Sequence, residues 1–222
     1  MKKIGVVLSG CGVYDGAEIH ESVITLLAID KLGAEALCMA PNKNQMHVVN
    51  HLTGSVTEGE TRNVLVESAR IARGQIRDMK DVTAKDFDAL ILPGGFGAAK
   101  NLCDFAVKGA DCAVDPEVER LVLETLAAKK PVGAICIAPA LLAAIQGDGK
   151  GRPRVTVGTD KSTAQAIGAM GACHVECQVE EFVVDTENKI VTTPAYMLAK
   201  RISEAAEGIE KLVKEVIRLM EE

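Results

Sequence analysis

The feature that most constrains the fold is the alternation of short apolar runs with a helical pattern at the start of the chain. Residues 3–9 are an apolar run that ends in glycines, and residues 19–32 carry apolar side chains at helical spacing. Residues 34–40 form a second apolar run, closed by Pro41. A strand, a helix and a strand in this order form a βαβ unit, whose two strands are parallel. The sequence therefore predicts a parallel sheet covered by helices.

The same alternation continues to the C-terminus. Further strands are expected at 89–92, 131–135 and 155–157, a hairpin on the sheet edge at 182–185 and 189–192, and helices at 62–72, 116–129, 138–145, 162–170 and 202–220. Residues 42–61 have no clear period and are expected to form a loop or a small hairpin. No linker or repeat interrupts the pattern. We expect a single three-layer α/β/α domain over residues 1–222, flavodoxin-like, with a mostly parallel sheet.

Composition excludes several classes of function. The net charge is −6, aromatic residues make up 3% of the chain and Trp is absent, so we expect no nucleic-acid partner. No apolar run approaches the ~20 residues that cross a bilayer, so no membrane association is expected. The chain has seven Cys at irregular spacings and no export signal. Reduced thiols and a cytoplasmic location are therefore expected.

The sharpest chemical feature is Cys136, which follows the predicted strand 131–135 and directly precedes a predicted helix. A strand, a nucleophile and a helix in immediate succession are typical of a nucleophile elbow. The N–H groups at the start of the helix favour a thiolate, so we expect the pKa of this cysteine to lie below its usual value of about 8.5. The competing interpretation is a small buried core residue.

Two other segments are expected at the same carboxyl edge of the sheet. Gly94 and Gly95, in the sequence PGGFG after strand 89–92, offer bare backbone N–H groups of the kind an oxyanion hole needs, although a simple turn is the alternative. Glu18, His20 and Glu21 lie at the start of the first helix. A carboxylate there can exchange protons with a substrate bound on sulfur. Helix capping by itself explains Asp15 or Glu18, whereas Glu21 lies a turn further in.

A metal site is not expected. The segment 173–177, CHVEC, carries two cysteines and a histidine, but strand alternation places Cys173 and Cys177 on one face and His174 on the other. Two ligands on one face do not complete a four-coordinate site. No cofactor is implied by the remaining sequence.

Several blocks together resemble one family. These blocks are LSGCGVYDG at 8–16, EIHE at 18–21, NHLTG at 50–54, PGGFGAAKNL at 93–102, CIAP at 136–139 and VTTPAY at 191–196. The chain resembles the PfpI/ThiJ superfamily, whose fold is like that of class I glutamine amidotransferase domains. More closely, it resembles the ElbB type, described as isoprenoid-biosynthesis proteins with an amidotransferase-like domain and as glutathione-independent glyoxalases.

The resemblance implies roles for individual residues. It makes Cys136 the nucleophile and Glu21 the general acid and base, with the backbone N–H groups of Gly95 and Ile137 as the oxyanion hole. Gly94, Glu18, His20 and Thr193 are possible auxiliary residues. It also implies self-association as a homodimer or a higher homo-oligomer.

The sequence departs from the family in its histidines. Ile137 stands where many members have a histidine, residues 157–160 contain none, and Thr193 begins the segment where true amidotransferases carry a His-x-Glu pair. Glutamine hydrolysis is therefore not expected, and the remaining base candidates are Glu21, His20, His51 and His174. The leading hypothesis is a cofactor-independent enzyme that converts glyoxal, or a related 2-oxoaldehyde, to glycolate. The alternative is a redox-sensing or binding protein that uses the same thiol.

Overall fold

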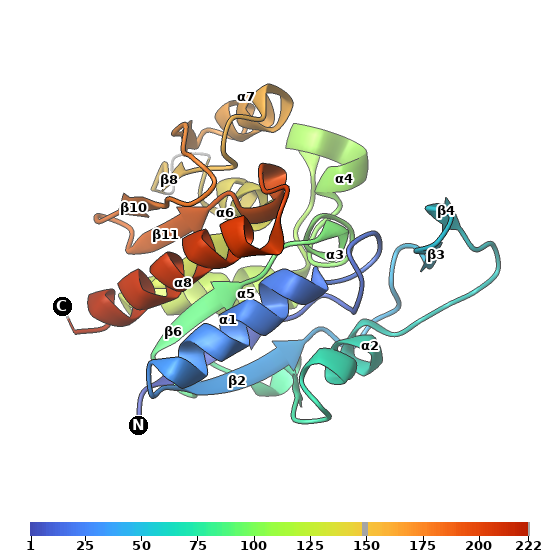
Figure 1. Cartoon of the computed structure of the whole chain (residues 1–222), viewed down its shortest axis with the longest axis horizontal. Coiled ribbons are helices and arrows are strands. Elements are labelled where there is room, and N and C mark those ends of the chain that lie inside the picture. The colour runs from blue at the N-terminus through green and yellow to red at the C-terminus, as the bar shows by residue number, and fades with distance from the viewer. Residues whose placement is uncertain (148–150, 222) are drawn as a thin grey trace.

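The computed structural model describes residues 1–147 and 151–221, and it confirms a three-layer α/β fold with a mostly parallel central sheet (Figure 1). The seven strands lie in the order β10-β11-β7-β6-β1-β2-β5. Their bounds are β1 Lys3–Val7, β2 Glu35–Ala40, β5 Arg77–Asp78, β6 Ala89–Leu92, β7 Val132–Ile135, β10 Val183–Asp185 and β11 Ile190–Thr193. Every pairing is parallel except that of β10 with β11.

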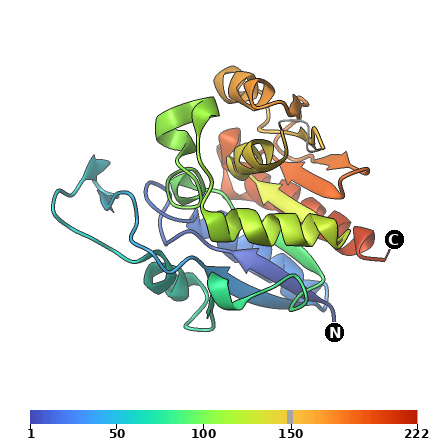
Figure 2. The same ribbon diagram turned by 180° about the vertical axis from the view of Figure 1, so that it is seen from behind.

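Helices cover both faces of this sheet. Their bounds are α1 Ile19–Lys31, α2 Val64–Ile71, α3 Phe96–Lys100, α4 Phe105–Lys108, α5 Pro116–Ala127, α6 Ala138–Gln146, α7 Lys161–Ala169 and α8 Ile202–Leu219, with short 3₁₀ turns at Met79–Asp81, Gly109–Asp111 and Ala195–Met197. Figure 1 shows α1 and α8 side by side on one face, and Figure 2 shows α5 and α6 on the other.

The central strands are apolar on both sides because each face carries its own core. On the face of α1 and α8, Ile4 and Val6 of β1 pack in one cluster with Ile209. On the opposite face, Val7 packs with Leu90 and with Leu121 of α5. Strands buried in this way read as continuous apolar runs in the sequence, which is why the pattern of β1, β6 and β7 was informative.

Most sequence-predicted elements are confirmed. In the C-terminal hairpin, β10 lies at the edge of the sheet, and β11 lies between β10 and β7 and runs parallel to β7. The exception is residues 155–157, predicted as a strand. There β8 (Arg154–Val155) pairs with β9 (Cys173–His174) in a separate two-stranded sheet. The two-residue edge strand β5 was missed because it is too short to show a period.

Residues 42–61 form an excursion that extends away from the sheet (Figure 1). It contains a small antiparallel hairpin of β3 (Val49–Asn50) and β4 (Ser55–Val56), one of the two forms expected from the sequence. Leu52, in the turn of this hairpin, is 94% exposed. Within the described ranges, no helix is long and apolar enough to cross a membrane.

Candidate active site

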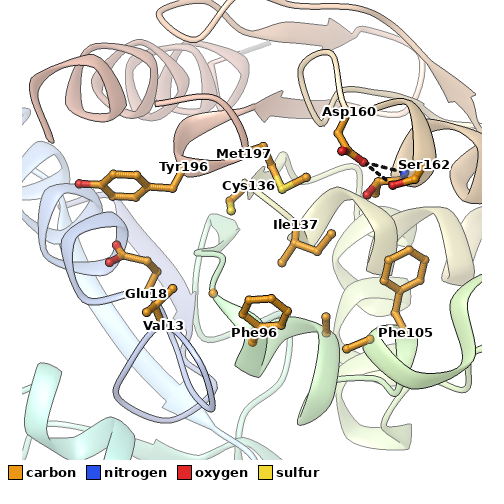
Figure 3. A pocket seen from close by; sticks show the side chains of 14 residues that line it. Val13, Glu18, Phe96, Phe105, Cys136, Ile137, Asp160, Ser162, Tyr196 and Met197 are labelled. Carbon is orange, nitrogen blue, oxygen red and sulfur yellow. Dashed lines mark hydrogen bonds between the residues drawn. The ribbon is translucent and has the colours of Figure 1, made fainter. Parts of the chain in front are cut away.

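The carboxyl ends of β6 and β7 and the start of α1 meet at a pocket of about 450 Å³ (Figure 3). Cys136, Gly95, Ile137 and Glu18 are among its lining residues. This is the sheet edge at which ligands bind in open α/β folds. The three segments that the sequence placed at one edge therefore do converge.

Cys136 occupies a sharp turn between strand and helix. Strand β7 ends at Ile135, α6 begins at Ala138, and Cys136 itself has φ +62°. This left-handed conformation is uncommon for a residue with a side chain and is typical of functional turns. The Cys136 N–H donates to the Thr193 carbonyl at 2.9 Å, which fixes the turn to β11. The elbow geometry predicted from the sequence is present.

Two backbone N–H groups point at the sulfur. Those of Gly95 and Ile137 both donate hydrogen bonds to the Cys136 thiol group. Gly95 has φ +92°, and a Cβ there would lie 2.3 Å from the Glu18 nitrogen, so only glycine fits. These are the two groups that the family resemblance implies as the oxyanion hole.

Glu21 lies beside the thiol and is fully buried. Its Oε2 accepts from the Gly94 N–H at 2.9 Å, and its Oε1 accepts from the Tyr196 N–H at 3.2 Å. The carboxyl group is also hydrogen-bonded to the thiol of Cys136. The position of Glu21 is thus set by groups from three separate segments.

Gly94 shapes the space between these two side chains. A Cβ at this position would lie 2.5 Å from the Cβ of Cys136 and 2.6 Å from Oε2 of Glu21, so a side chain has no room. Its N–H is engaged by Glu21 and its carbonyl accepts from the Glu18 N–H at 3.0 Å. Gly94 therefore holds the carboxyl, while Gly95 is the glycine whose N–H faces the sulfur.

The protonation of the pair differs from the sequence-based expectation. Burial, with a further contribution from the charge of Glu18, raises the pKa of Glu21 to about 8. Burial and the adjacent Glu21 charge raise the pKa of Cys136 well above its usual range. The predicted lowering of the cysteine pKa is wrong, because desolvation and the like charge outweigh the two N–H donors. At neutral pH the pair holds its protons.

The predicted auxiliary residues have different surroundings. Glu18 lines the pocket and also caps α1 by accepting from the Glu21 N–H at 2.7 Å. His20 is exposed, lies outside the pocket and shares a 2.8 Å hydrogen bond with the Tyr196 hydroxyl. The Thr193 hydroxyl donates to the Glu181 carbonyl, so Thr193 supports the elbow through its own carbonyl only.

The other base candidates lie elsewhere. The His51 ring accepts from the Tyr14 N–H, and the His174 ring accepts from the Val157 N–H. Asp15 does not cap the helix, since its carboxylate accepts from the Val49 N–H at 2.7 Å and ties the excursion to the first turn. Among the described residues, no histidine lines the pocket.

Part of the pocket was not found from the sequence. Asp160, Ser162 and Met197 line it, together with Phe96 and Phe105 (Figure 3). The sequence TDKST at 159–163 does carry a helix-start signal, and Asp160 caps α7 by accepting from the Thr163 N–H. Phe105 follows no pattern that would have placed it there, whereas Phe96 directly follows Gly95 in the turn that was expected at this edge.

The segment 173–177 does not form a cluster of ligands. Cys173 is exposed, whereas Cys177 is buried. Within the described part of the chain, no three His, Cys, Asp or Glu residues are grouped as a metal would need.

Residues 13–199 match the model of the DJ-1/PfpI family. The chain belongs to the DJ-1/PfpI family. A human protein named glutamine amidotransferase-like class 1 domain-containing protein 3, mitochondrial, is 48% identical over 98% of this chain and 83% of its own length. The zebrafish (Danio rerio) ES1 protein, mitochondrial, is 34% identical over 97% of this chain and 85% of its own length.

Two solved structures agree with the fold. An isoprenoid biosynthesis protein with an amidotransferase-like domain from Ehrlichia chaffeensis superposes with a TM-score of 0.90 at 38% identity, covering 97% of this chain and 99% of that one. Glyoxalase III from Candida albicans superposes with a TM-score of 0.62 at 14% identity, covering 98% and 97% of the two chains. At that identity the second likeness concerns the fold alone.

The expected cytoplasmic location is wrong, because the human, rat and zebrafish relatives are named as mitochondrial proteins. The expectation was based on reduced cysteines. All seven cysteines lie within the described ranges and are free. Free cysteines indicate a reducing rather than an oxidising compartment, but they do not identify which reducing compartment it is.

Proposed function

We propose that this protein is a cofactor-independent, thiol-dependent enzyme of the ElbB type that converts glyoxal, or a related 2-oxoaldehyde, to the hydroxy acid. The supporting observation is the Cys136–Glu21 pair: Cys136 lines the pocket and accepts from the N–H groups of Gly95 and Ile137, and the buried Glu21 carboxyl is hydrogen-bonded to its thiol from behind. A nucleophile at a cavity, two oxyanion donors and an adjacent proton carrier are the groups that carbonyl addition needs.

The first step forms a carbon–sulfur bond. The sulfur of Cys136 adds to one carbonyl carbon of glyoxal, and the electron pair of that carbonyl moves to its oxygen. The N–H groups of Gly95 and Ile137 stabilise the developing negative charge. The carbonyl oxygen then takes the proton that Glu21 and the thiol share, giving a hemithioacetal.

The second step moves hydrogen between two carbons. The Glu21 carboxylate removes the proton from the carbon bonded to sulfur, which gives an enediolate, and returns it to the neighbouring carbon. The hydroxyl proton moves from the oxygen of the first carbon to the oxygen of the second, so that the first becomes a carbonyl and the second an alcohol. The product is a thioester of glycolate on Cys136. Water then cleaves the carbon–sulfur bond, so that glyoxal and one water become glycolic acid and the thiol is restored.

The raised pKa values decide which state reacts. With both groups protonated at neutral pH, the pair loses its first proton mainly from Glu21, because the pKa of Cys136 lies higher. The Glu21 carboxylate then takes the thiol proton as the sulfur adds to the carbonyl carbon, which leaves a neutral acid to protonate the adduct. We therefore expect turnover to increase as the pH rises through about 8.

The redox-sensing alternative receives less support from this arrangement. Oxidation to sulfenic or sulfinic acid proceeds through an accessible thiolate. Cys136 is 8% exposed and its pKa is raised, both of which oppose that reaction. Self-association as a homodimer or higher oligomer stays a prediction.

The test is glycolate formation from glyoxal without added thiol, comparing the natural protein with Cys136→Ser. Cys173→Ser is the matched control, because it removes an exposed thiol outside the pocket. We expect glycolate from the natural protein and the control, and none above background from Cys136→Ser. Glu21→Gln should lower turnover by about 10²–10⁴-fold, the usual contribution of a general acid or base. Equal turnover by Cys136→Ser would exclude the proposal.

A further inference from the structure

We infer that the preferred substrate is an uncharged 2-oxoaldehyde with an apolar substituent of about aryl size, rather than glyoxal. The inference rests on the proposed function for its reaction and on the shape, lining and charge of the pocket for its substrate.

The size of the pocket is the first argument. Glyoxal has four non-hydrogen atoms, and at the ~30 Å³ that a water occupies in the liquid these would fill roughly 120 Å³. The pocket holds about 450 Å³. Cavities of 300–1,000 Å³ are those that enclose ligands of drug size. A dialdehyde bound to Cys136 would leave most of this volume filled by water.

The lining is the second argument. The wall beyond Cys136 is formed by Phe96, Phe105, Ile137 and Met197, which come from four different segments and border the cavity together (Figure 3). Phe96 is 47% exposed although it faces this cavity. An apolar substituent attached to the bound aldehyde would cover these side chains and remove their surface from water, which is favourable.

The charge of the lining is the third argument. Two carboxyl-bearing residues, Glu18 and Asp160, line the pocket, and none of the described lining residues is Lys or Arg. Hydrogen bonds from Thr163 and Ser162 hold the pKa of Asp160 below its usual range, so it is ionised at neutral pH. Lys100 does not line the pocket. Its ammonium group lies 5.0 Å from the centre of the Phe96 ring and donates a hydrogen bond to the Tyr14 carbonyl. A substituent with a carboxylate or phosphate is therefore disfavoured.

The experiment compares three aldehydes: glyoxal, phenylglyoxal and 4-carboxyphenylglyoxal, which adds a negative charge at nearly the same size. We expect kcat/KM for phenylglyoxal to exceed those for the other two by about tenfold or more. Phe105→Ala should reduce kcat/KM for phenylglyoxal by a larger factor than that for glyoxal. Phe182→Ala, a half-buried phenylalanine outside the pocket, is the matched control and should leave this ratio unchanged.

A second measurement does not depend on turnover. Alkylation rates of Cys136 with N-benzyl-iodoacetamide, iodoacetamide and iodoacetate compare a neutral aryl, a small neutral and a charged reagent, with exposed Cys173 as the internal reference. We expect the alkylation rate of Cys136, divided by that of Cys173, to be highest with N-benzyl-iodoacetamide, lower with iodoacetamide and lowest with iodoacetate. If the alkylation rates follow this order but none of the three aldehydes is turned over, the proposed function is excluded, while the inferred preference of the pocket for a neutral aryl group is supported. Turnover with glyoxal preferred, and no such order, would overturn the inference alone.

Discussion

Replacing Glu21 with glutamine keeps the size of a fully buried side chain and removes its titrating group. In the folded protein, burial raises the pKa of Glu21 from 4.5 to about 8. Unfolding exposes the carboxyl to water and restores its ordinary pKa. Below about pH 4.5 both states hold the proton, and above about pH 8 both have lost it. Between these values the folded state binds the extra proton, so stability falls as the pH rises.

The size of this loss follows from the two pKa values. At 1.36 kcal/mol for each pH unit between 4.5 and 8, the free energy of unfolding falls by about 5 kcal/mol across the window. Glu21→Gln removes this dependence. It also places an amide N–H₂ opposite the N–H of Gly94 or Tyr196, since both side-chain oxygens are acceptors in the natural protein. The mismatch costs about 1–3 kcal/mol, but this cost is the same at every pH.

The assay is urea unfolding of the natural protein and Glu21→Gln at pH 5, 6, 7 and 8. The readout is the difference in unfolding free energy between the two, because titrating groups that do not contact Glu21 contribute equally to both. Cys136, which does contact Glu21, stays protonated across this range because burial by itself raises its pKa. We expect this difference to shift in favour of the glutamine variant by about 4 kcal/mol from pH 5 to pH 8. Glu58→Gln, a change at an exposed glutamate, is the control and should show no such trend. Stability curves for Glu21→Gln that run parallel to those of the natural protein would refute the reasoning.

Three further predictions follow from the same site. Alkylation of Cys136 should accelerate as the pH rises through 8 and beyond, since burial and Glu21 raise its pKa; a rate already constant at pH 6 would contradict this. Gly94→Ala should abolish turnover and slow Cys136 alkylation at least tenfold, because the added Cβ would lie within 2.6 Å of atoms of both Cys136 and Glu21. Circular dichroism shows whether the variant folds. His20→Ala should keep glycolate formation within about twofold, because His20 is exposed, does not line the pocket and is hydrogen-bonded to the Tyr196 hydroxyl. A hundredfold loss would show instead that His20 acts as a base.

The sequence was informative wherever chemistry lies at the ends of buried strands. Continuous apolar runs located β1, β6 and β7, and the residues that directly follow such strands must meet at one sheet edge. Cys136 and Gly95 were therefore correctly predicted to lie together. Position at the start of the first helix placed Glu18, His20 and Glu21 at the same edge, and the family resemblance singled out Glu21, which lies in the first turn of α1 and is fully buried.

Two aspects of the site could not be predicted from the sequence. The far wall of the pocket comes from α4 and from the start of α7, whose position depends on packing between segments with no shared pattern. The direction of the cysteine pKa depends on how deeply the thiol is buried and on how close Glu21 lies. The sequence pattern predicts the helix N–H groups that lower the pKa of Cys136. The loss of water around the thiol, which raises this pKa by more, depends on the three-dimensional packing.

The hydrogen bonds of Glu21 also bear on how the protein reaches its reactive form. Its two backbone donors lie 73 and 175 residues away along the chain, and the elbow itself is fixed by the carbonyl of Thr193. Contacts between such distant segments close long loops and form slowly compared with local turns. A growing chain that has passed Cys136 but not reached Tyr196 already holds Glu21 and Gly94, but it lacks the Thr193 carbonyl that fixes the elbow and the Tyr196 N–H that holds Glu21. The arrangement that pairs the thiol with the carboxyl is therefore complete only after residues 193–196 have been made and have packed beside β7 and α1.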